Sequence, residues 1–150
     1  MRRKDRELGR EEALRILDEC EYAVVSMAND GEPYSVALSI ARDGECIYFH
    51  CAAVGKKVDM LRQNPRVCVI CVGGVNPSQT EFTTGYESVV VFGKASEIVE
   101  DEQKISALRL ISEKYTPGAM PRFNEEVVRS LKVTGVWRID IEEITGKGKK

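Results

Sequence analysis

Glycine-containing turns divide the first third of the chain into short runs of apolar residues, and this pattern restricts the fold more than any other feature. "NDGEP" separates the run 21–28 from the run 34–41, and "RDGE" separates the second run from 46–52. Asn-Asp-Gly and Asp-Gly between β-branched and aromatic residues are typical of hairpins, because glycine adopts the positive φ that tight turns require. We therefore predict a three-stranded antiparallel meander over residues 21–52.

Three more strands are predicted further along the chain, at 66–72, 86–99 and 133–144, with a loop at 73–80. The run 86–99 contains Gly93 at its centre, which indicates a β-bulge or a sharp bend. Bent long strands are the means by which small barrels turn corners. The loop prediction rests on the two glycines, the proline and the polar residues of "GGVNPSQT".

Four short helices are expected between the strands, at residues 11–20, 55–64, 101–115 and 124–132. About six antiparallel strands with short covering helices indicate a mainly β protein with some α structure, a small barrel formed by one domain over residues 1–150. Motifs typical of doubly wound nucleotide-binding folds, such as G-x-G-x-x-G, are missing from the sequence.

The composition suits a water-soluble protein, with 43% hydrophobic and 31% charged residues in 150 and a formal net charge of −2. No apolar run is long enough to span a bilayer, and "MRRKDREL" lacks the apolar region of a secretory signal, so we expect a cytoplasmic protein without membrane contact. The net charge also argues against a nucleic-acid partner. The basic clusters "RRK" and "KGKK" at the two ends are expected to be solvated tails.

Five cysteines are present, which is an odd number, and four of them lie inside strand-like runs. We interpret them as small buried hydrophobic residues in a reducing compartment. "CVIC" has the spacing of a metal-binding pair, but residues three apart on a strand point to opposite faces, so Cys68 and Cys71 are not expected to share an ion. No metal site is therefore predicted.

The segment "YFHCAAVGKK", residues 48–57, contains the chain's only histidine and ends in two lysines. If 46–52 is a strand, Tyr48 and His50 face a more polar environment while Phe49 and Cys51 face the core. Gly55 then begins a helix that carries Lys56 and Lys57. Free N–H groups at a helix start, a glycine and two ammonium groups together suit a phosphate dianion.

Ordinary structural roles explain the same residues. Two lysines at a helix start are commonly a solvated face, although cations there oppose the helix dipole unless an anion offsets them. A single histidine near a strand end is commonly a structural residue. The residues alone therefore leave the phosphate site and the solvated face open.

The sequence resembles the FMN-binding split-barrel superfamily, the pyridoxamine 5'-phosphate oxidase-like flavoproteins, and in particular its nitroimidazole-resistance (Nim-like) branch. "RRKDRE", "GEPYSVALSI", "YFHCAAVGKKVDMLRQNPRVCV" and "IDIEEITGK" match that branch in order and spacing, over nearly the whole chain. The resemblance implies a split barrel that binds FMN between the two subunits of a homodimer.

The resemblance also implies roles for particular residues. Lys56 and Lys57 match the basic pair that holds the phosphate, with Lys56 where the oxidases commonly have arginine. The resemblance implies that His50 is both a cofactor-binding residue and, beside the reactive face of the flavin, the candidate catalytic residue. The other implied cofactor-binding residues are Val36, Ala37 and Leu38 through their backbone, Cys51, Ala52 and Ser88.

The function implied is that of an FMN-dependent oxidoreductase, with a reduced nicotinamide as donor and a small electrophile, such as a nitroaromatic compound, as acceptor. The tryptophan-glycine and arginine features by which true pyridoxamine 5'-phosphate oxidases hold their substrate are not recognisable after Val133, which argues against that activity. Alternatives are a non-enzymatic flavin or haem binding protein, in which His50 could ligate iron, and a structural barrel that has lost its ligand.

Overall fold

The computed structural model describes residues 2–149, so that Met1 and Lys150, the two ends of the predicted domain, lie outside it. Within this range the chain forms eight strands: β1 (Glu7–Leu8), β2 (Ala23–Asn29), β3 (Glu32–Leu38), β4 (Ala41–Asp43), β5 (Cys46–Ala52), β6 (Arg66–Pro77), β7 (Thr84–Glu97) and β8 (Thr134–Lys149). The helices are α1 (Arg10–Glu19), α2 (Lys56–Gln63), α3 (Asp101–Tyr115) and α4 (Phe123–Ser130), with 3₁₀ segments η1 (Lys4–Arg6), η2 (Pro117–Arg122) and η3 (Leu131–Val133). None of these helices is long and apolar enough to cross a bilayer.

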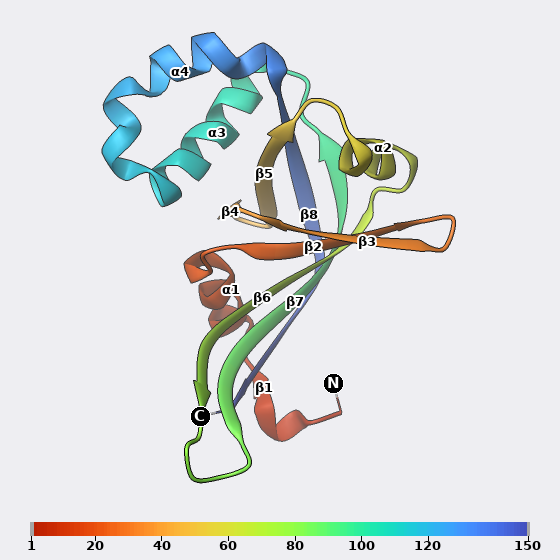
Figure 1. Cartoon of the computed structure of the whole chain (residues 1–150), viewed down its shortest axis with the longest axis vertical. Helices are drawn as coiled ribbons and strands as arrows, with labels where there is room; N and C mark the ends of the chain where they lie inside the picture. The colour runs from red at the N-terminus through yellow and green to blue at the C-terminus, as the bar shows by residue number, and fades with distance from the viewer. Residues whose placement is uncertain (1, 150) are drawn as a thin grey trace.

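One antiparallel sheet contains all the strands, in the order β3-β2-β6-β7-β8-β5-β4, with β1 paired to β8. The sheet curls but does not close, because the first strand of the order, β3, is not paired with the last, β4. Figure 1 shows the β2–β3 hairpin lying across the long strands β6, β7 and β8. The prediction of a mainly β split barrel with short helices is therefore confirmed, although the number of strands is eight and not six.

The predicted meander over residues 21–52 is wrong. β3 pairs with β2, but β5 pairs with β4 and β8, at the opposite end of the strand order. The chain leaves β3 at Ile40, which is fully buried and whose carbonyl oxygen accepts hydrogen bonds from the Tyr115 hydroxyl at 2.9 Å and the Lys114 ammonium at 3.0 Å. Because the end of α3 binds this backbone, residues after Leu38 cross to the other edge instead of folding back onto β3.

Two strands extend beyond their predicted ends. β6 continues to Pro77, through the first part of the predicted loop, where the pairing with β7 has an irregularity between Gly73 and Asn76. β8 continues to Lys149, so the described part of "KGKK" is a paired strand and not a solvated tail. Its lysines contact neighbours across the sheet: the Lys147 ammonium lies 5.7 Å from the centre of the Tyr86 ring, and Lys149 contacts Thr83.

The main core lies inside the curled sheet, where α1 packs its apolar face against the strands. Ala13, Ile16 and Leu17 of α1 are at most 3% exposed. Phe49 and Trp137 stack within the same cluster, with ring centres 6.4 Å apart. The prediction that Phe49 faces the core from the strand 46–52 is therefore confirmed.

The opposite face of β5 and β8 is less polar than predicted. Strand alternation puts Val136 on the outer face of β8 together with Arg138, yet Val136 is fully buried. Tyr48, which we predicted to face a more polar environment, is half-buried against it. The reason is α3, whose Ala107 packs with Val136 and Ile98 to form a second, smaller core. A helix added outside the barrel thus hides part of a strand face that alternation alone assigns to solvent.

The cysteines are also less uniformly buried than predicted. Only Cys20 and Cys71 are buried, while Cys46, Cys51 and Cys68 are half-buried. Cys68 and Cys71 do lie on opposite faces of β6, as the spacing predicted.

Gly93 marks the bend in β7. The pairing of β7 with β8 shifts register between Phe92 and Gly93, which confirms the predicted bulge. A Cβ atom at Gly93 would lie only 2.3 Å from the Asp140 carbonyl oxygen and 2.9 Å from Ile139 Cγ2. Because β8 approaches so closely, glycine is the residue that the bend requires.

We expect Gly93→Ala to lower the free energy of unfolding by about 1–3 kcal/mol, because the new methyl group must displace the β8 backbone. Urea denaturation followed by circular dichroism measures this change. Gly118→Ala in η2 is the matched control, since nothing lies within 4 Å of its Cβ position, and it should change stability by no more than about 0.5 kcal/mol. Equal stability of both variants would contradict this account of the bend.

Candidate functional site

The start of α2 lies between β3 and β5. The Lys56 ammonium is 4.8 Å from the centre of the Tyr34 ring on β3, and the Lys57 ammonium is 5.8 Å from the centre of the Phe49 ring on β5. The two adjacent lysines therefore contact strands from opposite ends of the strand order. This arrangement follows from Gly55, whose φ of +133° turns the chain sharply into the helix.

The same place has the properties of an anion site. Within residues 2–149 neither Lys56 nor Lys57 forms an ion pair with a carboxylate, and no side chain caps the first turn of α2. A Cβ atom at Gly55 would meet nothing within 4 Å, so the space before the helix is open. Two uncompensated ammonium groups beside free N–H groups fit a phosphate, which would also offset the repulsion between cations and the helix dipole.

The end of β5 borders this place. His50 projects from the outer face of β5 and is exposed, whereas Cys51 projects inward and is half-buried; Ala52 is exposed. Desolvation, and secondly the positive charge of Lys57, lower the pKa of His50 below its ordinary 6.5. The imidazole is therefore neutral at pH 7. Burial raises the pKa of the Cys51 thiol, so this sulfur is a poor nucleophile.

The predicted backbone contacts lie on an edge strand. Among the described strands β3 pairs only with β2, so about half of its backbone N–H and C=O groups point away from any partner strand. Val36 and Leu38 direct half-buried side chains toward the core, and Ala37 is exposed on the outer face. Val36, Ala37 and Leu38 can thus offer backbone hydrogen bonds to a ligand that lies along the open edge.

Ser88 lies apart from the lysines and His50 in a single chain. It is half-buried on the outer face of β7, with its hydroxyl 3.5 Å from the Lys147 carbonyl oxygen. Glu97 lies nine residues further along β7 and pairs with Trp137 on β8. Trp137 in turn pairs with Phe49 on β5, so Glu97 and Phe49 lie at the same level of the sheet. At about 3.3 Å per residue, roughly 30 Å of strand separates Ser88 from the level of Phe49. By the register through β6 and β2, about 17 Å separates Ser88 from the level of Tyr34. The fold therefore brings together the lysines, the end of β5 and β3, but not Ser88.

Sequence reasoning did not identify Tyr34. Its ring lies under the Lys56 ammonium and its side chain packs against the main core, so it positions that lysine from β3. The signal was present in the alternation of Tyr34, Val36 and Leu38 along β3, which places the three on one face.

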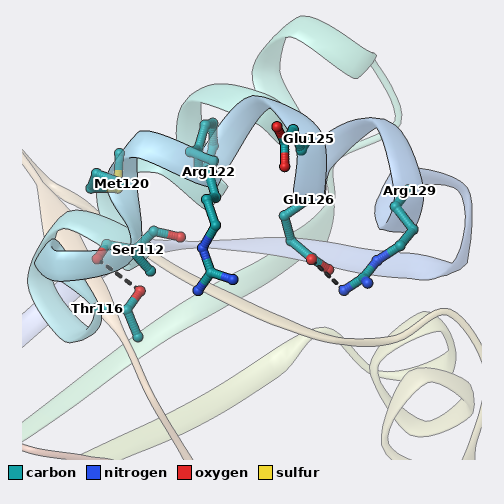
Figure 2. A pocket seen from close by; sticks show the side chains of 9 residues that line it. Ser112, Thr116, Met120, Arg122, Glu125, Glu126 and Arg129 are labelled. Atoms are coloured by element: carbon teal, nitrogen blue, oxygen red, sulfur yellow. Dashed lines mark hydrogen bonds and ion pairs between the residues drawn. The ribbon is translucent and has the colours of Figure 1, made fainter.

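Two pockets lie elsewhere, around α3, and neither contains a predicted site residue. The first, of about 480 Å³, lies between α3, η2 and α4, and Figure 2 shows that polar groups around it bond to one another, Thr116 to the Ser112 carbonyl and Arg129 to Glu126. The second, of about 600 Å³, lies between α3 and the outer face of β4, β5 and β8, with Tyr48 and Ala107 in its lining. The predicted residues instead form an open surface.

An antiparallel barrel that curls without closing defines the split-barrel class. The family model of the pyridoxamine 5'-phosphate oxidases matches residues 9–148. The chain belongs to this family.

Solved structures agree with this classification. An FAD-binding protein from Mesorhizobium loti is 26% identical, with a TM-score of 0.72 and coverage of 97% of this chain and 98% of that one. A candidate 5-nitroimidazole antibiotic resistance protein from Bacteroides thetaiotaomicron is 22% identical, with a TM-score of 0.80 and coverage of 95% and 86%. An FAD and haem binding protein from Mycobacterium smegmatis is 22% identical, with a TM-score of 0.77 and coverage of 95% and 72%. At 22% identity the last two show the fold alone.

The environment of His50 predicts its titration. Because desolvation and the Lys57 charge both oppose protonation, the midpoint should lie below 6.5. Removing the charge in Lys57→Gln should raise the midpoint but leave it below 6.5, since desolvation is the larger cause. Proton NMR of the imidazole measures this without ambiguity, because the chain has one histidine.

Lys4→Gln, which removes an exposed charge in η1, is the matched control and should leave the midpoint of His50 unchanged. A midpoint at or above 6.5 in the parent protein would show that the imidazole is freely solvated and not influenced by Lys57.

Proposed function

We propose that this protein binds FMN at the split of the barrel and acts as a flavin-dependent oxidoreductase. The observation that carries the proposal is the pair of lysines at the start of α2, which have no carboxylate partner among the described residues and flank an open space. A phosphate dianion would supply the missing negative charge and accept hydrogen bonds from the first turn of the helix. Cytoplasmic location remains part of this proposal.

A flavin fits the remaining geometry of the site. With its phosphate at Lys56 and Lys57, the ring would extend along the free edge of β3, where the backbone groups of Val36, Ala37 and Leu38 match the polar edge of an isoalloxazine. Membership of the oxidase family and the likeness to a FAD-binding protein support a flavin ligand. The choice of FMN rests on the single phosphate group that two adjacent lysines suit.

The open surface supports a second copy of the chain as the other wall of the site. Neither of the two pockets around α3 is lined by the predicted residues, and Ser88 lies along β7 away from the lysines of its own chain. The outer face around Ser88 is apolar and exposed, with Val72 54% and Phe92 43% accessible. In the homodimer we propose, this face covers the partner's flavin and Ser88 belongs to the partner's site.

When bound, a flavin supplies hydride and single-electron transfer, here from a reduced nicotinamide to a small electrophile such as a nitroaromatic compound. The residues of this chain would hold the cofactor and orient the acceptor. Because the pKa of His50 is lowered, its neutral imidazole is a hydrogen-bonding group at pH 7 and a weak source of protons. We therefore assign His50 the orientation of the acceptor beside the cofactor, in preference to proton donation.

The first experiment is the visible spectrum of the purified protein, with the released chromophore identified by mass. FMN is expected. FAD or haem would replace the proposed ligand, and a folded colourless protein that takes up no added flavin would refute the proposal.

The lysines provide a quantitative form of this test. Charge-assisted hydrogen bonds to a phosphate contribute about 1.5–3 kcal/mol each, so Lys56→Gln and Lys57→Gln should each weaken FMN binding by roughly 10- to 100-fold. Riboflavin, which lacks the phosphate, should bind parent and variants alike. Fluorescence titration measures both ligands, and Lys4→Gln is the control. An equal loss of riboflavin affinity would show that the variants disturb the fold and not a phosphate contact.

His50→Ala should retain FMN but lower the turnover of an acceptor by about tenfold or more, the loss expected for one orienting hydrogen bond of about 1.4 kcal/mol. Steady-state kinetics with NADH and a nitroaromatic acceptor measures the change. His50→Gln, which keeps a donor and an acceptor, should recover part of the rate if the role is orientation. Parental rates in His50→Ala with every acceptor tested would remove His50 from the mechanism.

A further inference from the structure

The side chains of Cys20 and Cys71 meet in the main core, and neither residue belongs to the candidate site. The Cys71 thiol donates a hydrogen bond to the Cys20 sulfur, with the two Sγ atoms 3.3 Å apart. Cys20 follows the last residue of α1, and Cys71 lies on the inward face of β6, 51 positions along the chain. Cysteines that serve only as small hydrophobic core residues do not need to place their sulfur atoms in contact.

The two thiols differ in a way that suits sequential chemistry. The hydrogen bond from Cys71 lowers the pKa of Cys20 to about 7, against the opposing effect of desolvation, and the Lys114 ammonium at the end of α3 acts in the same direction. Asp18 opposes the change. The same hydrogen bond and burial raise the pKa of Cys71. The Cys20 thiol also donates a hydrogen bond to the Leu17 carbonyl oxygen at 3.1 Å. Of the two sulfurs, Cys20 is therefore the one that loses its proton more readily.

The solvent accessibility of the two cysteines also favours Cys20 as the first to react. Cys20 is 8% exposed where α1 ends and the chain enters β2, whereas Cys71 is 2% exposed in the middle of β6. The residue after α1 has extended backbone angles, outside the rigid helix, so the side chain of Cys20 can rotate toward its neighbour without unwinding a turn. A small oxidant reaches Cys20 first.

We propose that Cys20 and Cys71 form a redox-active dithiol that a hydroperoxide converts to an intramolecular disulfide. The Cys20 thiolate attacks one peroxide oxygen, the O–O bond breaks, and protonation of the leaving oxygen gives water or an alcohol and a sulfenic acid on Cys20. The Cys71 thiol then attacks that sulfur, forming the S–S bond and releasing water. Two electrons pass from the two thiols to the peroxide. This proposal does not depend on the proposed function.

The other three cysteines provide the contrast. Cys46 lies by Asp140, Cys51 by Lys57 and Glu97, and Cys68 is half-buried on the outer face of β6; no sulfur–sulfur contact involves them within residues 2–149. The pairing is thus specific to the one place where α1 meets β6. A bond there would join the covering helix to the centre of the sheet.

Peptide mapping of the folded protein tests the pairing directly. Trypsin places Cys20 in peptide 16–42, and both Cys68 and Cys71 in peptide 67–94. Cys68→Ser removes the ambiguity, because peptide 67–94 then contains only Cys71. After brief exposure to hydrogen peroxide, alkylation and digestion without reductant, we expect the two peptides to be linked in the parent and in Cys68→Ser, and the link to disappear with dithiothreitol.

Stability gives a second readout. A bond that closes a loop of about 50 residues should raise the Tm of the oxidised protein by roughly 5–10 °C, and dithiothreitol should reverse the rise. Cys20→Ser and Cys71→Ser should lack both the link and the rise. Failure of peptides 16–42 and 67–94 to link in folded protein after excess peroxide would overturn the proposal. So would linkage at comparable yield between peptide 16–42 and peptide 43–56, which carries both Cys46 and Cys51, because that would indicate oxidation of unfolded chains.

Discussion

The failure of β3 to pair with the strand that follows it is the constraint on which the rest of this structure depends. Hydrogen bonds from Tyr115 and Lys114 hold the Ile40 backbone after β3 ends, and the chain crosses to the other end of the sheet. A closed barrel would have satisfied both edges and left no place for a ligand between them. The split instead leaves a free backbone edge on β3 and a gap toward β5, which the start of α2 spans.

Charge is concentrated at that gap without being neutralised. Arg42 pairs with Asp18 and Arg62 with Glu97, whereas none of the lysines within residues 2–149 forms an ion pair. The ammonium groups of Lys56 and Lys57 lie over the rings of Tyr34 and Phe49. Contacts with Tyr34 and Phe49 orient the ammonium groups but contribute only about 0.5–1 kcal/mol each at exposed sites. Their charge therefore remains available to an anion, and the charge of Lys57 adds to desolvation, the larger cause, in lowering the pKa of His50.

Local patterns predicted the elements well, and long-range pairing poorly. The helix over 101–115 and the bend at Gly93 were both predicted from spacing and from glycine, because each depends on neighbours in sequence. The meander failed because the hydroxyl that redirects the chain at Ile40 belongs to Tyr115, 75 positions away. Burial of Val136 was missed for a related reason: α3 covers a strand face that alternation alone assigns to solvent.

In the candidate site, too, the features that depend on sequence neighbours were predicted and those that depend on long-range pairing were not. Gly55, Lys56 and Lys57 are consecutive, so their meeting at one helix start follows from the sequence once the helix is predicted. The contribution of Tyr34 requires knowing that β3 lies beside α2, and the place of Ser88 requires the register of three strands. Because that register puts Ser88 on an exposed apolar face far from its own chain's lysines, the residues predicted as one site become neighbours only if a second chain supplies part of them. In the homodimer we propose, the open edge of β3 and the exposed face of β6 and β7 are two halves of one binding surface.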